Sequence, residues 1–201
     1  MKKNIVLLIV IFMISCKQTT SNNDEIKVSK EIYESILKIE LTQSDDLSKD
    51  KFLYAQMDEY MRSILNGNLD IVADYSYPDI QVWIDEKYPN MVNNREDFKK
   101  VFLEPMKKIN ELTKDKETKV EYEVGDITKR LHSVEGDTMV YLIVSSIIIK
   151  HKFEEIKNGD ENVAVSFDGG KKWKLMIKDE EMTREILRYK FSDESINKLL
   201  N

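Results

Sequence analysis

Cysteine is almost absent from this chain of 201 residues, which contains only Cys16. Without a second cysteine no disulfide can form within the chain, and zinc sites built on several thiolates are excluded. Its two histidines, His132 and His151, do not have the short spacing typical of a zinc-binding helix. Because phosphate-binding loops, nucleophile elbows and HExxH motifs are missing too, we expect neither a cofactor nor a metal ion.

The chain also lacks an excess of basic residues and a long hydrophobic run. Its formal net charge is −6, whereas nucleic-acid binding needs a basic surface, so nucleic acid is excluded as a partner. The longest unbroken apolar run, residues 5–14, is much shorter than the ~20 residues of a membrane-spanning helix. The hydrophobic content of 41% is nevertheless sufficient for a folded core, and the length favours one domain.

The first residues have the pattern of a secretory signal. Two lysines form a short basic region, the apolar run follows, and the small residue Ser15 precedes Cys16. Residues 13–16 resemble the lipobox of bacterial lipoproteins, with Met13 where leucine is usual. The resemblance implies cleavage after residue 15 and several acyl chains on Cys16, which would hold the chain to a membrane.

Lys17 stands at the position after the cysteine, where many lipoproteins that stay in the inner membrane have aspartate. The resemblance therefore implies the outer membrane, in a cell that has one. The alternative is an ordinary secretory signal that is cut near a cysteine by chance. We expect a signal peptide over residues 1–15, the lipidated cysteine and a polar, flexible tether over 16–28, and a single α+β domain over 29–201.

Apolar spacing in the first half of the domain predicts mainly helices. Residues 50–66 carry apolar side chains along one helical face, and Gly67 follows as a stop signal. Residues 80–84, which include Trp83, predict a brief strand. Three further helices are expected, over residues 29–40, over residues 69–75, and from Asn94 onward with a kink at Pro105.

From residue 118 onward the apolar residues alternate, which predicts strands. Gly125 shifts this alternation and indicates a bulge. Residues 140–149 are almost all apolar, as in a central strand buried on both faces. Turns are expected at 135–137, 158–159 and 168–170, followed by a last strand and a helix over 192–200. Helices followed by an antiparallel meander indicate an α+β fold, with the helices packed on one face of a strongly bent antiparallel sheet.

Several of these segments resemble nuclear transport factor 2-like domains. They are residues 66–70, Tyr77-Pro78, the helix capped at Asn94, and residues 167–173, within a region of about 48–180. The resemblance implies a cystatin-like cone in which a bent sheet wraps helices around an apolar pocket. Many members of this family pair through the outer face of the sheet, and the run 140–149 would suit such a homodimer. A central strand covered by the chain's own elements is the alternative.

Residues 166–173 resemble an Asp-box, with Lys172 in the usual place of threonine. One copy in a chain of this length excludes a propeller. The residue types predict a hairpin turn in which Asp168 bonds nearby backbone, the glycines adopt positive φ and Trp173 packs beneath. A sugar or metal contact is the alternative reading of the same residues.

The resemblance to the cone-shaped family implies that polar side chains could line a pocket. The candidates are Tyr54, Asp58, Tyr75, Tyr77, Tyr122 and His132. None of them belongs to a recognisable acid–base set, and tyrosines at this spacing usually serve in a core or at a rim. We assign no catalytic residue, and both His132 and His151 are expected at strand ends.

These observations favour a membrane-tethered binding module for a small molecule or an envelope protein. The first alternative is a small-molecule enzyme, of the hydratase, isomerase or cyclase type, with acid–base residues in the cone. The second is a dimeric scaffold that binds no ligand. A closed apolar pocket holding paired ionisable groups would favour the enzyme.

Overall fold

The computed structural model describes residues 38–89, 104 and 106–201. Within them the expected α+β class is confirmed: five strands form one antiparallel sheet in the order β1-β2-β3-β4-β5. The strands are β1 (Leu41–Gln43), β2 (Thr118–Ser133), β3 (Met139–His151), β4 (Glu154–Ser166) and β5 (Lys174–Ile177). The helices with defined bounds are α3 (Asp50–Asn66), α4 (Leu69–Tyr75), α5 (Asp79–Lys87), α7 (Glu180–Leu187) and α8 (Asp193–Leu200).

Helix α3 begins and ends at the residues that its apolar spacing predicts. Leu53, Met57 and Ile64 are buried along one face. Gly67 closes the helix in the left-handed conformation, with φ of 71°, which glycine adopts readily because it has no Cβ. Helix α4 follows at once and buries Val72. Both predicted helices are therefore confirmed.

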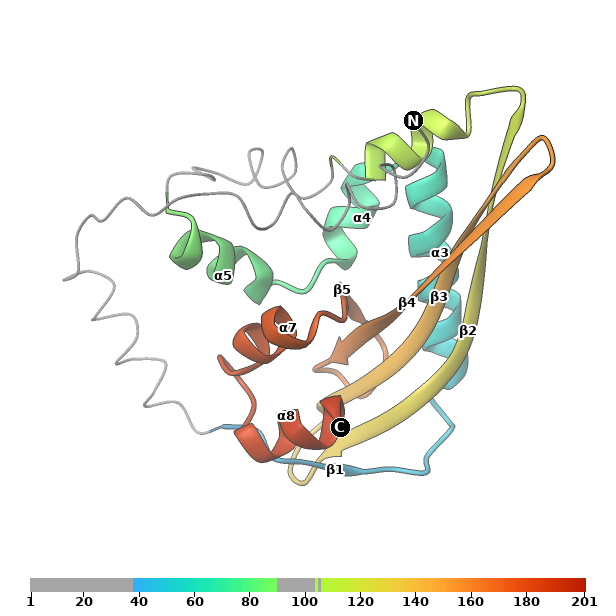
Figure 1. Ribbon diagram of the computed structural model, residues 1–201. Helices are drawn as coiled ribbons and strands as arrows, with labels where there is room; N and C mark the ends of the chain where they lie inside the picture. Colours follow the sequence, from blue (N-terminus) through green and yellow to red (C-terminus); the bar gives the residue numbers. More distant parts are fainter. Residues whose placement is uncertain (1–37, 90–103, 105) are drawn as a thin grey trace. The chain divides into compact units, whose positions relative to one another are not determined.

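Strands β2, β3 and β4 are long, and β3 lies at the centre of the sheet. Figure 1 shows all three strongly bent, with the β3–β4 hairpin ending away from α7 and α8. The pairing of β2 with β3 shifts register between Val124 and Ile127. This shift confirms the irregularity expected at Gly125.

The apolar residues of β3 alternate between two cores, one on each face of the sheet. Val140 and Leu142 belong to a core with residues of α5, α7 and α8. Tyr141 and Ile143 belong to the other core, with residues of α3 and α4. All four are at most 3% exposed, so two-sided burial of this part of the strand is confirmed. Helices therefore cover both faces of the sheet, rather than the single face expected.

The segment around Trp83 is helical, so the prediction of a strand over 80–84 is wrong. Ile80, Trp83 and Ile84 lie at the i, i+3, i+4 spacing of α5 and are buried in the core of α7 and α8. Five residues are too few for periodicity to separate a strand from one face of a helix. Packing against the sheet decides between them.

The loop between β3 and β4 is Lys152-Phe153, so the turn predicted at Asn158-Gly159 is wrong. Lys152 has a φ of 54°, in the left-handed region. Gly159 lies within β4 opposite Ser146, where an added Cβ would come within 2.9 Å of the Ser146 Oγ. The glycine thus allows two strands to approach closely and does not reverse the chain.

The beginning and the end of the described domain contact each other. Ile39 bridges Phe191 and β1 pairs with the end of β2, so residues 38–40 are not helical as predicted. Helix α7 is an element that the sequence prediction lacks, and Asp179 caps it by accepting a hydrogen bond from a backbone N–H. Helix α8 confirms the last predicted helix, with Ser192 as its cap.

Other expectations fall outside the described residues. They include the lipid site at Cys16, the tether, residues 29–37 and the start of the helix at Asn94 with its kink at Pro105. The helix predicted from Asn94 extends into the described residues, and residues 106–112 are helical. Among the helices that the structure describes, none combines the length and apolar character needed to span a membrane.

Candidate binding site at the edge of the sheet

The first half of β2 forms an edge of the sheet. Residues 118–124 pair with β3 on one side, whereas β1 meets β2 only over Leu131–Ser133. On the other side of residues 118–124, the described part of the chain provides no strand. An edge of this kind presents backbone N–H and C=O groups that can pair with another extended chain.

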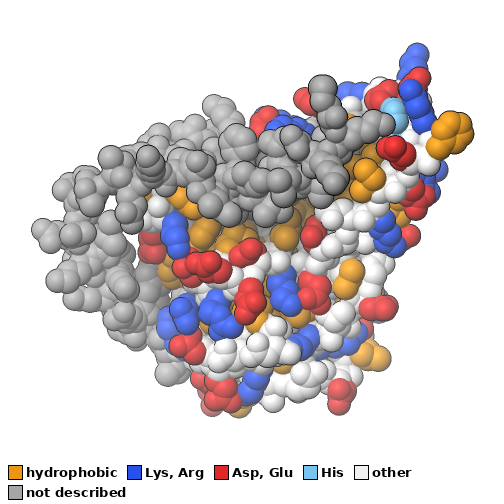
Figure 2. Space-filling view, in the orientation of Figure 1, with side chains coloured by type: hydrophobic (Ala, Val, Ile, Leu, Met, Phe, Trp, Pro, Cys, Tyr) orange, Lys and Arg blue, Asp and Glu red, His pale blue; other side chains and the backbone are white. Residues whose placement is uncertain are grey.

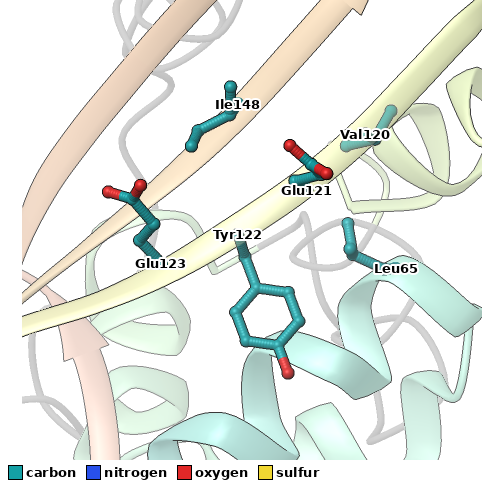
Figure 3. Close-up of a pocket in the computed structure, with 6 residues that line it drawn as sticks. All are labelled: Leu65, Val120, Glu121, Tyr122, Glu123 and Ile148. Atoms are coloured by element: carbon teal, nitrogen blue, oxygen red, sulfur yellow. The ribbon is translucent and has the colours of Figure 1, made fainter.

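An open hollow of about 410 Å³ lies across this edge. It is lined by Leu65, Val120, Glu121, Tyr122, Glu123 and Ile148. In Figure 3, Tyr122 points from β2 toward the helices, while Glu123 and Ile148 lie on the other side of the strand. The hollow therefore brings together apolar groups on the helix side, charged groups on the other side and the strand edge between them.

On the helix side of the hollow, Tyr122 and Asp58 form a hydrogen bond. The tyrosine hydroxyl donates to the Asp58 Oδ1 over 2.6 Å, and Arg62, one turn further along α3, pairs with the same carboxylate. The bond to Asp58, followed by burial, raises the pKa of Tyr122. The structure thus brings two of the predicted residues together, as a neutral tyrosine held by a carboxylate and suited to hydrogen bonding.

On the opposite side of the strand, charged residues form a cluster over Ile148, which is buried. Glu121 accepts hydrogen bonds from Lys119 and Lys150, and Glu123 pairs with Lys157. The ammonium groups of Lys119 and Lys150 lower the pKa of Glu121 to about 2. The charged cluster, Lys119, Glu121, Glu123, Lys150 and Lys157, was not predicted, although alternation of charge along residues 119–123 is its signal in the sequence.

Replacing Lys119 and Lys150 together by methionine should return the pKa of Glu121 toward 4.5. Each single replacement should raise it by less, because one ammonium remains. The native interaction favours folding above the unfolded pKa and is lost as the pH falls through about 2. Carboxyl carbon NMR titration measures the change, and a Glu121 pKa that does not respond to the double replacement would refute this assignment.

The other predicted residues lie elsewhere. The Tyr75 hydroxyl donates a hydrogen bond to the Glu59 carboxylate, and its ring packs edge-on against Tyr60. Tyr54 is partly buried against the core that contains residues of α3 and α4. Neither Tyr54 nor Tyr75 lines a described hollow. They support the packing of α3 and α4, as their helical spacing would allow.

His132 belongs to a packed cluster beside Tyr141. Its Nε2 lies 2.8 Å from the Tyr141 hydroxyl oxygen, and the two rings are nearly parallel, with centroids 5.7 Å apart. Burial lowers the pKa of His132, with a smaller opposing effect from Asp46, which favours the neutral ring. Neither described hollow is lined by these residues, which indicates a structural role.

His151 lies at the other end of the sheet, next to the β3–β4 loop. Its Nδ1 is 2.9 Å from the Thr118 hydroxyl oxygen and 4.0 Å from a carboxylate oxygen of Asp115. Both predicted positions at strand ends are therefore confirmed, and the two histidines lie at opposite ends of the β2–β3 pair. Among the described residues, no group of three or more His, Cys, Asp or Glu side chains could hold a metal ion.

Tyr77 is 1% exposed and borders a second hollow, of about 250 Å³, between α4, α5 and β5. Its hydroxyl has no hydrogen-bond partner among the described residues. Burial, with a further contribution from the nearby carboxylate of Asp79, raises the pKa of Tyr77 far above its usual value. Asp79 is itself held by Lys190, whose Nζ lies 2.6 and 2.7 Å from its two oxygens.

Replacing Lys190 by methionine should destabilise the chain by about 2 kcal/mol. The Asp79 side chain is 10% exposed, and its carboxylate would be left buried without a counter-ion. The effect is below the ~3–5 kcal/mol of a fully buried pair, because Lys190 is 36% exposed. Urea denaturation of Lys190→Met and of the double variant Lys190→Met with Asp79→Leu measures the loss of stability. The double variant should recover most of this loss. Equal stabilities of the two variants would show that an unpaired buried carboxylate is not its cause.

The predicted hairpin turn at Asp168 is present. Asp168 accepts hydrogen bonds from the hydroxyl of Ser166 and the backbone of Lys171 and Lys172, and the indole of Trp173 donates to the Gly170 carbonyl over 3.1 Å. These bonds satisfy the turn internally. The residues of the Asp-box resemblance therefore have a structural role, and they lie apart from the edge of β2.

No protein-family model, curated protein or solved structure matches this chain. The class of site is therefore defined by its residues: an exposed sheet edge with an apolar side and a charged side. Figure 2 shows acidic and basic side chains interspersed on the visible described surface, without a large area of one sign.

Proposed function

We propose that this protein is a lipid-anchored protein of the cell envelope whose α+β domain binds another polypeptide along the edge of β2. The hollow across residues 120–123 carries this proposal, because it exposes apolar groups beside strand backbone with which no described strand pairs. An added strand gains affinity from main-chain hydrogen bonds and specificity from side-chain hollows. This geometry suits an extended chain.

A protein partner is favoured over a small molecule because the hollow is open and lies across an edge. Small-molecule sites are concave and bury most of their ligand. The acid–base enzyme is less well supported, because Asp58 with Tyr122, Tyr75, Tyr77 and His132 lie in four separate places. Chemistry on one substrate requires such groups to converge.

The proposed anchor is the lipidated Cys16, with outer-membrane residence supported by Lys17. Residues 17–37 would then join the anchor to the described domain. The predicted flexible tether within this segment, residues 16–28, would span roughly 20 Å, so the edge of β2 would work close to a membrane. An envelope protein is the partner that this location would supply.

We also propose a distant relation to nuclear transport factor 2-like domains. The order of α3, α4 and the long antiparallel strands supports it. Helices on the second face of the sheet depart from the single helical layer of the expected cone. The relation therefore concerns the arrangement of elements and carries no activity with it.

Photo-crosslinking in intact cells tests the binding function. A photoreactive amino acid is placed at Val120 in the full chain, and at Val134, an exposed residue in the loop at the other end of β2 and β3, as the matched control. We expect a discrete protein adduct from position 120 and none of that size from position 134. If position 120 yields no adduct, the proposal is wrong, and native mass spectrometry of the extracted chain for a retained small molecule then tests the small-molecule alternative.

A further inference from the structure

The edge of β2 has a sequence that is complementary to itself. Residues 120 and 122 face the helices, whereas residues 119, 121 and 123 belong to the charged cluster on the opposite side. In an antiparallel pair of two such edges centred on Glu121, Val120 would lie opposite Tyr122, and Lys119 opposite Glu123. Each of these contacts occurs twice, because the two edges are related by a twofold axis.

We propose that the edge of β2 pairs with the same edge of a second copy of this chain, in antiparallel orientation and centred on Glu121. This inference rests on the proposed function and names its partner. The two sheets would join into one, with the apolar hollow of each copy beside Tyr122 of the other. Directly opposed residues of such a pair contribute through both opposite charge and apolar contact.

The charges select this orientation. Lys119 is 70% exposed and Glu123 54% exposed, so both can reach across the edge. The one like-charged contact, between the two Glu121 side chains at the axis, is offset because Lys150 already holds each carboxylate. A shift of one residue would place Val120 opposite Glu121 and mix the apolar and charged sides.

The association differs from pairing through the outer sheet face. Over Val140–Ile143 both faces are covered by the chain's own helices, and further along β3 the charged cluster covers Ile148. Over Val140–Ile143 the sheet thus offers no free apolar face for pairing. Its edge combines apolar groups, charges of both signs and backbone hydrogen-bonding groups.

Cysteine cross-linking of the full chain in its membrane tests the proposed register. Opposed residues on paired antiparallel strands have Cα atoms about 4.5–5.5 Å apart, which a disulfide spans. Glu121→Cys should therefore form a disulfide-linked dimer on mild oxidation. Lys119→Cys is the matched control, since its two copies would lie roughly 14 Å apart, four residues along the strands.

We expect at least about tenfold more dimer from Glu121→Cys than from Lys119→Cys, because only the former satisfies disulfide geometry. The unaltered chain is a second control, because any disulfide-linked dimer that it forms must come from Cys16. Equal cross-linking of both variants, or none from Glu121→Cys, overturns the inference. If the photoreactive residue at position 120 then cross-links to a different protein, the proposed binding function stands and only the proposed self-pairing is wrong. If position 120 yields no adduct, both the binding function and the self-pairing are wrong.

Discussion

Trp173→Ala is expected to destabilise the chain by about 3–5 kcal/mol, the cost of removing a large buried aromatic side chain. Trp173 is 1% exposed, and its ring lies 4.7 Å from that of Tyr141, centroid to centroid. It connects the Asp168 turn to the core beneath α3. A domain typically has only ~5–15 kcal/mol of stability, so this loss would leave much of the chain unfolded at 37 °C.

Hydrogen bonds add to the loss of packing. The Trp173 indole donates to Gly170, and the Trp173 backbone N–H donates to the side chain of Gln56 on α3 over 3.0 Å. Without the indole, the buried Gly170 carbonyl loses this donor. Trp173→Phe keeps an aromatic ring but removes the hydrogen bond and part of the buried ring volume, so we expect a smaller loss than from Trp173→Ala, about 1–3 kcal/mol.

Urea denaturation of the full chain in mild detergent, followed by circular dichroism, measures these values. Phe153→Ala is the control, because this phenylalanine is fully exposed in the β3–β4 loop and its removal should change stability by less than about 0.5 kcal/mol. A Trp173→Ala variant within 1 kcal/mol of the parent would contradict the packing described for this core.

Cys16→Ser is expected to abolish acylation and with it stable membrane attachment. Each acyl CH₂ that is buried in a membrane contributes ~0.8 kcal/mol, and two or more chains anchor a protein where one holds it only weakly. We therefore expect the acyl chains to supply most of the membrane affinity of the processed protein.

Metabolic labelling with an alkyne fatty acid, followed by detergent phase partition, measures this change. Ser15→Ala is the matched control, because alanine is also small and should leave cleavage and labelling intact. The alternative, an ordinary secretory signal, predicts no label on the parent chain and equal partition of the parent and Cys16→Ser. That result would remove the anchor from the proposed function.

The sequence predicted correctly those helices that have a clear apolar face together with a recognisable cap or stop residue. Helix α3 has a long apolar face and ends at Gly67, and α8 has its cap at Ser192. The failures occur where packing overrides a short signal. Residues 80–84 read equally well as a strand, and Asn158-Gly159, a common turn pair, lies inside β4 because pairing with β3 continues past it.

The candidate site was harder to predict because its parts are distant in sequence. Tyr122 and Asp58 are 64 residues apart, and only the packing of α3 against β2 brings their side chains within hydrogen-bond distance. Tyr77 and His132 have the same residue types as pocket groups, yet they lie in other clusters. The free edge depends on β1 being short, which no periodicity of β2 indicates.

Amide hydrogen exchange over residues 118–124 tests the central claim, that this edge binds a polypeptide. The full chain is compared in its membrane and after dilution into detergent, with residues 131 and 132, which are paired with both β1 and β3, as the reference. We predict that the amides facing away from β3 exchange nearly as slowly as the reference in the membrane, and much faster after dilution. Fast exchange of these amides under both conditions would contradict the claim.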